Sequence, residues 1–458
     1  LLRLFQILRQ VRVYRVLQLV YLSTAFVPNG RIAPMLPLSN MEKYIRAHLR
    51  YNVTMNLMDG AFFGLALGFG SFATIIPLFV TRMTDSAILI GLAPAFHAIG
   101  WQLPQLFNAG QLARAREYKP IVLRNTIHER IPFLVLALIA FLIPWIGIKT
   151  ALFVTFIALA WQGIGGGFTA NPWTSLISKI IPPESRGTFF GMQGGLVNLV
   201  ISIAAIGAGY LLAEVEFPNN FAISFFIAGL AFIASYIALS SSREPRDEEK
   251  VVSEKQAHFW EDAKSILKKD KNFNWFLVTR FLMMFATMGF GFYILLGLRR
   301  FEMDSITAGY LTAALTLTQT FANAGMGWLG DKIGHRAMLI LGALATIVSS
   351  IIAWFAPTIA WLYPAFILSG IGNVALWTIG ITFTVGFGSD LERPTYIGLS
   401  NTLITPATIT APILGGWLID SLGFESTFGL SALIGIITAG ILIFVVKDPK
   451  PQTIDHGR

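Results

Sequence analysis

The sequence predicts an all-α integral membrane protein with twelve transmembrane helices in two six-helix repeats. Composition is the first reason: 13% of the 458 residues are charged, against about 25% in a soluble domain, and the mean hydropathy is +0.64. The second is uncharged runs such as 196–213, close to the roughly 20 residues that a helix needs to cross a bilayer. The third is an internal repeat. This composition excludes a disordered chain and is not that of a soluble enzyme.

Twelve apolar segments are long enough to span a bilayer. Many contain Gly, Pro, Ser, Thr or Asn, which bilayer helices tolerate because neighbouring helices satisfy the interrupted backbone. The segments lie near residues 53–80, 86–109, 119–146, 150–176, 187–213, 219–242, 273–298, 304–328, 336–356, 359–388, 398–420 and 424–446.

One long polar stretch divides these segments into two sets of six. It contains a short helix, near 260–269, that we expect on the membrane surface. We therefore expect a six-helix bundle at 41–242, a cytoplasmic linker at 243–272, a second bundle at 273–447 and a cytoplasmic tail at 448–458.

Basic residues are distributed unequally between the two sides of these helices. With a cytoplasmic N-terminus, about 28 of the 34 Lys and Arg residues fall on inner segments and four on outer loops. Because cytoplasmic loops carry the excess of Lys and Arg, we expect both termini in the cytoplasm of a cell-membrane protein. The net charge of +9 therefore fits membrane orientation better than nucleic-acid binding.

The first 40 residues stand apart from the helical pattern. Four arginines lie among apolar residues in 1–18, which is compatible with a basic amphipathic helix on the membrane surface. The other interpretation, which we favour, is that residues 1–40 are a non-core extension outside the functional protein, with Met35 or Met41 as its start.

Short motifs recur at a fixed offset between the two sets of segments. Gly-Ile-Gly at 163–165 returns at 370–372, 207 positions later. At the same offset, Arg-Gly-Thr-Phe-Phe-Gly at 186–191 matches Arg-Pro-Thr-Tyr-Ile-Gly at 393–398. Matches in one register, next to corresponding helices, indicate a duplication, and transporters built from repeats place their site at the repeat interface.

The most specific motif is Gly-Trp-Leu-Gly-Asp-Lys-Ile-Gly-His-Arg at 327–336, between the eighth and ninth segments. It resembles the loop signature of the major facilitator superfamily, Gly-x-Leu-(Gly/Ala)-Asp-(Arg/Lys)-x-Gly-(Arg/His)-(Arg/Lys). Residues 411–420 are similar to that superfamily's eleventh helix, and residues 182–187 to its loop after helix four. The resemblance covers about 400 residues, from roughly 41 to 447.

The resemblance implies roles for this loop. Glycines allow a tight turn, and the Asp can accept hydrogen bonds from the N-terminus of a neighbouring helix, which in the family helps to hold the cytoplasmic side shut. The basic residues would meet anionic lipid head groups. In the first-half copy at 110–117, Arg114 replaces the expected Asp, so a matching latch there is in doubt. The loop-motif residues are Gly327, Gly330, Asp331, Lys332, Gly334 and Arg336.

Four ionisable residues lie inside the predicted spans: Asp59, Glu129, Arg130 and Arg280. Such residues are costly in a bilayer and usually face a bundle interior or a water-filled cavity. Asp59 and Arg280 each lie about 10 Å from the start of corresponding helices, so they either pair across the two halves or extend to the inner rim. Glu129 is our choice for a proton-carrying group, because a carboxylate removed from water binds a proton more readily.

Polar side chains recur at helical spacing in the second and eighth segments, and would lie on one helix face. Such a face suits a central cavity, although interhelical hydrogen bonds worth about 0.6 kcal/mol each give the same pattern. We favour the cavity because corresponding helices carry both stripes. The predicted cavity residues are His97, Trp101, Gln105, Gln162, Thr316, Gln319, Asn323, Asn373 and Trp377.

Together these features predict a secondary active transporter that moves a small solute by alternating access, with coupling to protons. The alternative is a membrane protein of the same fold that does not transport but binds or delivers a lipid, pigment or partner subunit. Sparse charge and 37 Phe residues are compatible with that alternative.

Enzymatic activity is not expected. The sequence has no HExxH or GxSxG motif, and without Cys it has no thiolate nucleophile or thiolate metal ligand. We therefore expect no catalytic residues, metal or cofactor. The expected partners are a small-molecule solute and the lipid bilayer, without nucleic acid, and the family resemblance implies a monomer.

Overall fold

The computed structural model describes residues 40–102, 104, 115–246, 259–388 and 392–449, and these residues contain helices and no strand. The chain divides into two compact units, Leu1–Tyr44 and Ile45–Arg458. The second unit contains every site residue discussed below.

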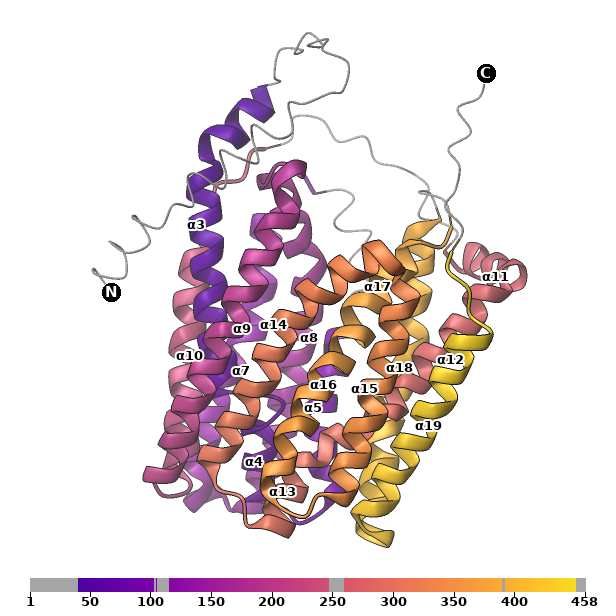
Figure 1. The fold of residues 1–458 in the computed structure, drawn as a ribbon. Helices are drawn as coiled ribbons and strands as arrows, with labels where there is room; N and C mark the ends of the chain where they lie inside the picture. Colours follow the sequence, from indigo (N-terminus) through magenta and orange to yellow (C-terminus); the bar gives the residue numbers. More distant parts are fainter. Residues whose placement is uncertain (1–39, 103, 105–114, 247–258, 389–391, 450–458) are drawn as a thin grey trace. The chain divides into compact units, whose positions relative to one another are not determined.

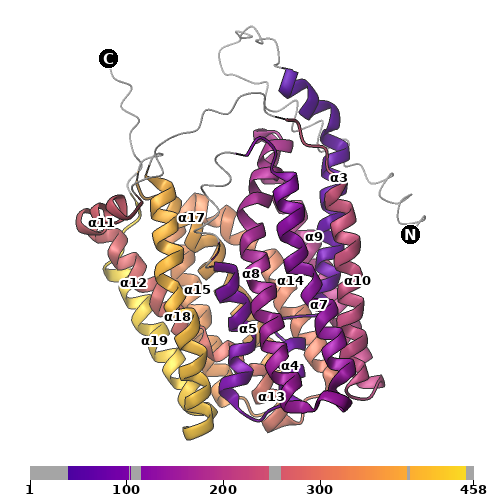
Figure 2. The ribbon, with the colours of Figure 1, turned by 180° about the vertical axis from the view of Figure 1, so that it is seen from behind.

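Helices of the first half run alongside one another (Figures 1 and 2). They are α3 (Asn40–Phe69), α4 (Ile75–Thr81), α5 (Ala87–Gln102), α7 (Lys119–Ile146), α8 (Ile148–Ile180), α9 (Pro183–Glu214) and α10 (Asn219–Ser240). The short helix α11 (Phe259–Lys269) follows.

The second half is also helical and contains more short elements. It consists of α12 (Lys271–Ala286), η3 (Met288–Phe292), α13 (Tyr293–Phe301), α14 (Ser305–Ile333), α15 (His335–Phe355), η4 (Ile359–Trp361), α16 (Leu362–Val374), η5 (Ala375–Ile379), α17 (Gly380–Val385), α18 (Arg393–Leu422) and α19 (Phe424–Phe444).

Helical structure occupies each of the twelve predicted segments, and an all-α chain with multiple apolar spans is confirmed. Within the described residues, nine helices are long and apolar enough to cross a membrane. Three predicted segments are not among the nine: those of α3, α5 and α14. α5 has only 16 described residues, α3 carries Asn52, Asn56 and Asp59, and α14 carries a row of Thr, Gln and Asn. In α3 and α14 some of these polar residues, Asp59, Thr316, Gln319 and Asn323, are also candidate site residues.

Local sequence explains where several helices begin and end. The side chain of Asp304 accepts a hydrogen bond from the Thr307 backbone N–H at 2.7 Å and so caps α14. Asp270 caps α12 in the same way, through Phe273 N–H at 2.9 Å. The turn between α14 and α15 is made by Gly334, whose φ of +98° favours glycine.

Two corresponding spans break into a long and a short helix, α3 with α4 and α12 with α13. The first break lies at Gly70, where a Cβ would overlap the Phe133 ring. The short helices α4 and α13 pack together at one end of the molecule's second unit (Figure 1). We refer to this as the α4/α13 end.

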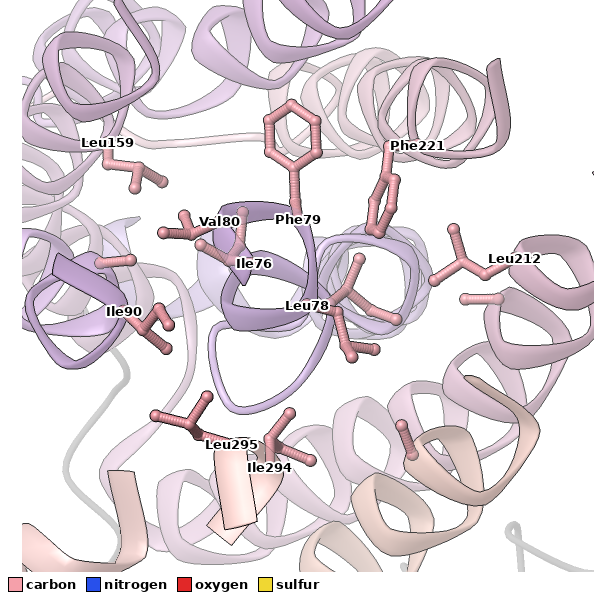
Figure 3. Close-up of a cluster of buried hydrophobic side chains, with 14 of the residues drawn as sticks. Ile76, Leu78, Phe79, Val80, Ile90, Leu159, Leu212, Phe221, Ile294 and Leu295 are labelled. Atoms are coloured by element: carbon pink, nitrogen blue, oxygen red, sulfur yellow. The ribbon is translucent and has the colours of Figure 1, made fainter. Parts of the chain in front are cut away.

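A single buried apolar cluster joins the two halves at the α4/α13 end. Ile76 and Phe79 of α4 lie at its centre, and Ile294 and Leu295 of α13 complete it from the second half (Figure 3). Each of these four side chains is at most 3% exposed. Burial of apolar surface therefore holds the halves together here.

At the opposite end, the described residues of the two halves have separate cores. One cluster contains buried side chains from Val122 to Leu239 only, and the other from Ala263 to Val446 only. The apolar clusters thus join the halves at one end and leave them independent at the other.

The contact between α9 and α14 widens in the same direction. Near the α4/α13 end, a Cβ added at Gly309 would lie 2.6 Å from the Ala205 carbonyl oxygen. Farther along, a Cβ at Gly195 would lie 3.9 Å from the nearest atom of Thr320. At Gly191 and Gly327, an added Cβ would meet no atom within 4 Å. The closest approach of the two helices therefore lies near the α4/α13 end, and toward the opposite end these glycines face open space.

We predict that Gly309→Ala destabilises the protein, because its methyl group would force the α14 backbone away from α9. Overpacking of this kind costs about 1–3 kcal/mol. The matched control is Gly327→Ala on the same helix, which should be neutral or stabilising by up to about 1 kcal/mol, since Ala favours helix over Gly. Thermal unfolding in detergent measures both, and an equal effect of the two variants would contradict the close contact.

Candidate functional site

Three helices of the first half bring a buried ion pair together. The Arg130 guanidinium, on α7, lies 3.2 Å from the Asp59 carboxylate on α3. The hydroxyl of Ser235, on α10, donates to the same Asp59 oxygen at 2.6 Å and accepts from Arg130 Nη2 at 2.9 Å. Asp59 is 4% exposed and Arg130 6%, so this pair lies in the bundle interior.

A second carboxylate, that of Glu129, completes the charge cluster. Its Oε2 lies 3.5 Å from Arg130 Nη1 and accepts a hydrogen bond from the Thr126 hydroxyl at 3.2 Å. A Cβ added at Gly166 of α8 would lie 3.2 Å from Glu129 Oε1 and 3.3 Å from Trp101 Cδ1. Glu129 and Trp101 therefore meet over a glycine that leaves room for both.

The repeated Gly-Ile-Gly motif allows close helix approach in both halves. At Gly163, a Cβ would lie 2.6 Å from the His97 carbonyl oxygen of α5, and at Gly370 it would lie 3.1 Å from the Leu315 carbonyl oxygen of α14. His97 Nδ1 lies 2.5 Å from Gln162 Oε1, and its ring stacks on Phe72 with centroids 4.0 Å apart. Two predicted cavity residues thus bond to each other.

Neither alternative for Asp59 and Arg280 is seen in this structure: the two residues do not pair with each other, and both are buried rather than extended to the rim. Asp59 pairs with Arg130 inside the first half. Arg280, 3% exposed, donates to Ser400 Oγ at 2.7 Å and to the Leu376 carbonyl at 3.3 Å inside the second half. Partners within each half lie closer, and the serines among them carried no signal in sequence that marked them as partners.

The remaining predicted cavity residues do not converge on one point. Thr316 is 6% exposed and bonds to Ser202 at 2.7 Å across the α9–α14 contact, where it joins the halves rather than lining a cavity. Asn323 accepts from Thr378 at 2.8 Å, and its amide donates to the Gln319 carbonyl at 2.8 Å. Gln319 is half-buried.

Two more predicted residues lie within the second half. Asn373 lines a cavity of about 10 Å³ with Ser350 and Ser369, which is close to the volume needed for one water molecule. Trp377 is half-buried against the apolar cluster of this half. Gln105 lies outside the described residues.

The loop motif at the opposite end makes contacts inside the second half. Arg336 donates to the carbonyls of Leu442, at 2.8 Å, and Ile443, which tie the loop to the end of α19. Lys332 lies 3.7 Å from the Trp328 ring centroid. Asp331 has a 79% exposed side chain, 3.7 Å from His335, and accepts no N–H of a neighbouring helix among the described contacts.

An unforeseen contact closes the α4/α13 end. The Asp420 carboxylate, at the end of α18, accepts hydrogen bonds from the Ala87 N–H at the start of α5, at 3.0 and 3.1 Å. Arg299 lies 3.9 Å from Asp420 and donates to the Asp85 carbonyl. Gly416 permits this approach, since a Cβ there would lie 2.6 Å from the Ile88 nitrogen. We call Asp420, Arg299 and Gly416 the latch.

In the latch, the Asp420 carboxylate lies at the N-terminus of a helix, α5. The loop motif predicted this type of contact for Asp331, which lies at the opposite end of the second unit. Residues 411–420 were singled out by family resemblance alone, and nothing in sequence linked Asp420 to Ala87, 333 positions away. Such partners are set by how the halves dock.

We predict that Asp420→Asn weakens the latch and exposes the contact between α5 and α18. The chain has no Cys, so a single Thr405→Cys, buried at 7% exposure beside Gln102, reports opening through its rate of maleimide labelling. Loss of about 1 kcal/mol at a partly exposed contact should raise that rate about fivefold.

The control for this measurement is Glu425→Gln, which removes an exposed carboxylate paired with Arg300 inside the second half at 3.7 Å. It should leave the labelling rate of the Thr405→Cys reporter unchanged. Equal labelling with and without Asp420→Asn would show that the latch does not hold this end closed.

The chain belongs to the Major Facilitator Superfamily, whose family model matches residues 121–304 and 298–457. Among curated relatives, MFS-type transporter ppzB of Metarhizium majus is 26% identical over 145 residues, 32% of either chain. The probable vesicular acetylcholine transporter-B of Danio rerio is 29% identical over 152 residues, 33% of this chain and 31% of the relative. The chain therefore spans about a third of the length of the curated relatives that it matches.

Solved structures share the fold over most of the chain. A POT family transporter in complex with a thioalcohol conjugated peptide has a TM-score of 0.70 at 12% identity, covering 87% of this chain and 97% of that one. The D-xylose-proton symporter has a TM-score of 0.68 at 13% identity, covering 89% and 100%. At this identity the likeness concerns the fold alone.

Proposed function

We propose that this protein is a secondary active transporter that moves a small solute by alternating access, with twelve transmembrane helices in two six-helix halves. The observation that carries the proposal is the one-sided contact: a shared core and latch at the α4/α13 end, and separate cores at the opposite end. A rocking motion that exchanged these arrangements would expose the interface to each side in turn.

The duplication supports this proposal. Corresponding first helices of the two halves are broken near the same end, and the repeated glycines 163 and 370 each admit the backbone of a neighbouring helix. With bundles at 41–242 and 273–447, the halves are two similar bodies around one interface.

The basic residues give this proposal an orientation. Because Lys and Arg concentrate at the end opposite α4 and α13, that end faces the cytoplasm and the latch faces outside. The described arrangement is then inward-facing, in a monomer of the cell membrane.

Proton coupling is proposed at Glu129. Two carboxylates share one guanidinium in a buried site, so the cluster carries a negative charge unless one carboxylate binds a proton, and a buried unbalanced charge is costly. Asp59 receives two hydrogen bonds from Arg130 and Ser235, whereas Glu129 receives one, from Thr126. Protonation of Glu129 therefore costs fewer hydrogen bonds to the carboxylate than protonation of Asp59 would.

We predict that Glu129→Gln lowers proton-driven uptake on the order of tenfold, because Gln holds the neutral state permanently. Proteoliposomes with an imposed pH gradient and an internal pH dye measure the uptake. The solute panel follows the similar proteins described above: a peptide, D-xylose and acetylcholine. Exchange of labelled for unlabelled solute without a gradient should persist, since binding and rocking remain.

The matched control is Glu216→Gln, the same change at an exposed carboxylate, which should transport as the wild type does. Gradient-driven uptake that survives Glu129→Gln would reject the proton role. A folded wild-type protein that moved no solute of a broad panel would favour a binding protein instead.

A further inference from the structure

The two buried arginines of this chain differ in their partners. Arg130 lies beside two carboxylates, Asp59 at 3.2 Å and Glu129 at 3.5 Å. Arg280 is as deeply buried, at 3% exposure, yet among the described residues no Asp or Glu lies within ion-pair distance of it. Removing a charge from water without a counter-charge costs several kcal/mol, so this site has an unmet need for an anion.

The hydrogen bonds of Arg280 leave donors unused. A guanidinium has five N–H donors. Among the described residues, Arg280 donates one bond to Ser400 Oγ and one to the Leu376 carbonyl, both neutral acceptors. Its Nε is buried without any partner. A buried donor that is left unsatisfied is destabilising. Arg130 also has two buried nitrogens without a partner, Nε and Nη1, but among the described residues only Arg280 combines such a donor with the lack of a neighbouring carboxylate.

Space for such a ligand adjoins the guanidinium. Arg280 lines a cavity of about 20 Å³, which is enough for one water-sized group. Thr279 and Thr438 are the other polar side chains of its lining, and the rest of the lining is apolar. A Cβ added at Gly380 would lie 3.5 Å from Arg280 Nε and Cζ, so the glycine keeps the unpartnered Nε uncrowded.

The backbone around the cavity is irregular in a way that serves this site. The π-helical turn η5 supplies the Leu376 carbonyl that Arg280 binds, and π-turns inside helices occur frequently at functional sites. The same turn carries the exposed Thr378, which bonds to Asn323 of α14 at 2.8 Å. The turn therefore connects the Arg280 site to α14.

We propose that Arg280 binds an anionic group: a small inorganic anion such as chloride, or the carboxylate of the transported solute. The transport part of this inference rests on the proposed function, whereas the binding part does not. An anion at Arg280 would supply the missing counter-charge and accept the bond that Nε can donate.

The test uses the full-length protein, purified in detergent, and chloride and formate as probes. Thermal unfolding is followed in sodium chloride, sodium formate and sodium isethionate, whose bulky sulfonate is the reference at equal ionic strength. A ligand that binds only the native state raises the midpoint, and we expect a rise of about 2 °C in chloride or formate. A rise with chloride identifies an inorganic anion, and a rise with formate alone identifies a carboxylate.

Variants assign the effect to the site. Arg280→Gln should abolish the rise in the unfolding midpoint. In isethionate this variant should be at least as stable as the wild type, because it removes an uncompensated charge. If Arg280 had a purely structural role, the variant would instead be less stable than the wild type in isethionate. Arg280→Lys keeps the charge but loses the planar donor set, and it should halve the rise. If Arg280→Gln does not fold, this variant tests whether the anion effect depends on Arg280. Arg246→Gln, at a 73% exposed arginine, should keep the full rise.

No rise in the wild type, or the same rise in Arg280→Gln or Arg280→Lys, would overturn the anion site. Either failure leaves the Glu129 flux test unaffected. A rise that depends on Arg280, in a protein that moves no solute, would keep the anion site and reject transport.

Discussion

Burial of one apolar core between two bodies is the constraint on which the rest of this structure depends. Because α4 and α13 are short and packed together, side chains such as Phe79 and Leu295 form an apolar core shared by both halves at this end, and among the described residues no apolar core is shared at the opposite end. The close contact at Gly309, the widening at Gly195 and the latch at Asp420 all follow from that one-sided docking. Because the shared core lies at a single end, each half can keep a core of its own and could move relative to the other half.

Charge is distributed between the halves in a complementary way. The first half holds two buried carboxylates with one arginine, and the second holds one buried arginine without a carboxylate among the residues described around it. In neither half do the charges of these buried groups cancel, and a net charge inside a bilayer costs free energy. A proton on the first half and an anion on the second would each restore balance, which gives the proposed transporter two ligands whose binding is linked to charge.

The sequence alone predicted the helices well and the contacts poorly. Hydropathy located the nine spans that are found among the described residues, because a bilayer imposes a length and an apolar surface. The depth of Asp59, Glu129 and Arg130 marked them as interior. Pairing was not predictable: Ser235 and Ser400 are ordinary helix residues until the fold brings them to an arginine. A stripe of Thr has one pattern whether it lines a cavity or joins two helices, so Thr316 was interpreted wrongly for this structure.

Alternating access is tested most directly by two distances between the halves, one at each end of the interface between α9 and α14. Two double-cysteine variants carry the spin labels. The first replaces Tyr210 and Tyr310, whose hydroxyls lie 3.2 Å apart near the α4/α13 end. The second replaces Gly191 and Gly327, which lie toward the opposite end of α9 and α14. In a membrane with transported solute, we expect two populations in which one pair is close whenever the other is far. Distances that lengthen together, or an opposite end that never closes, would contradict alternating access.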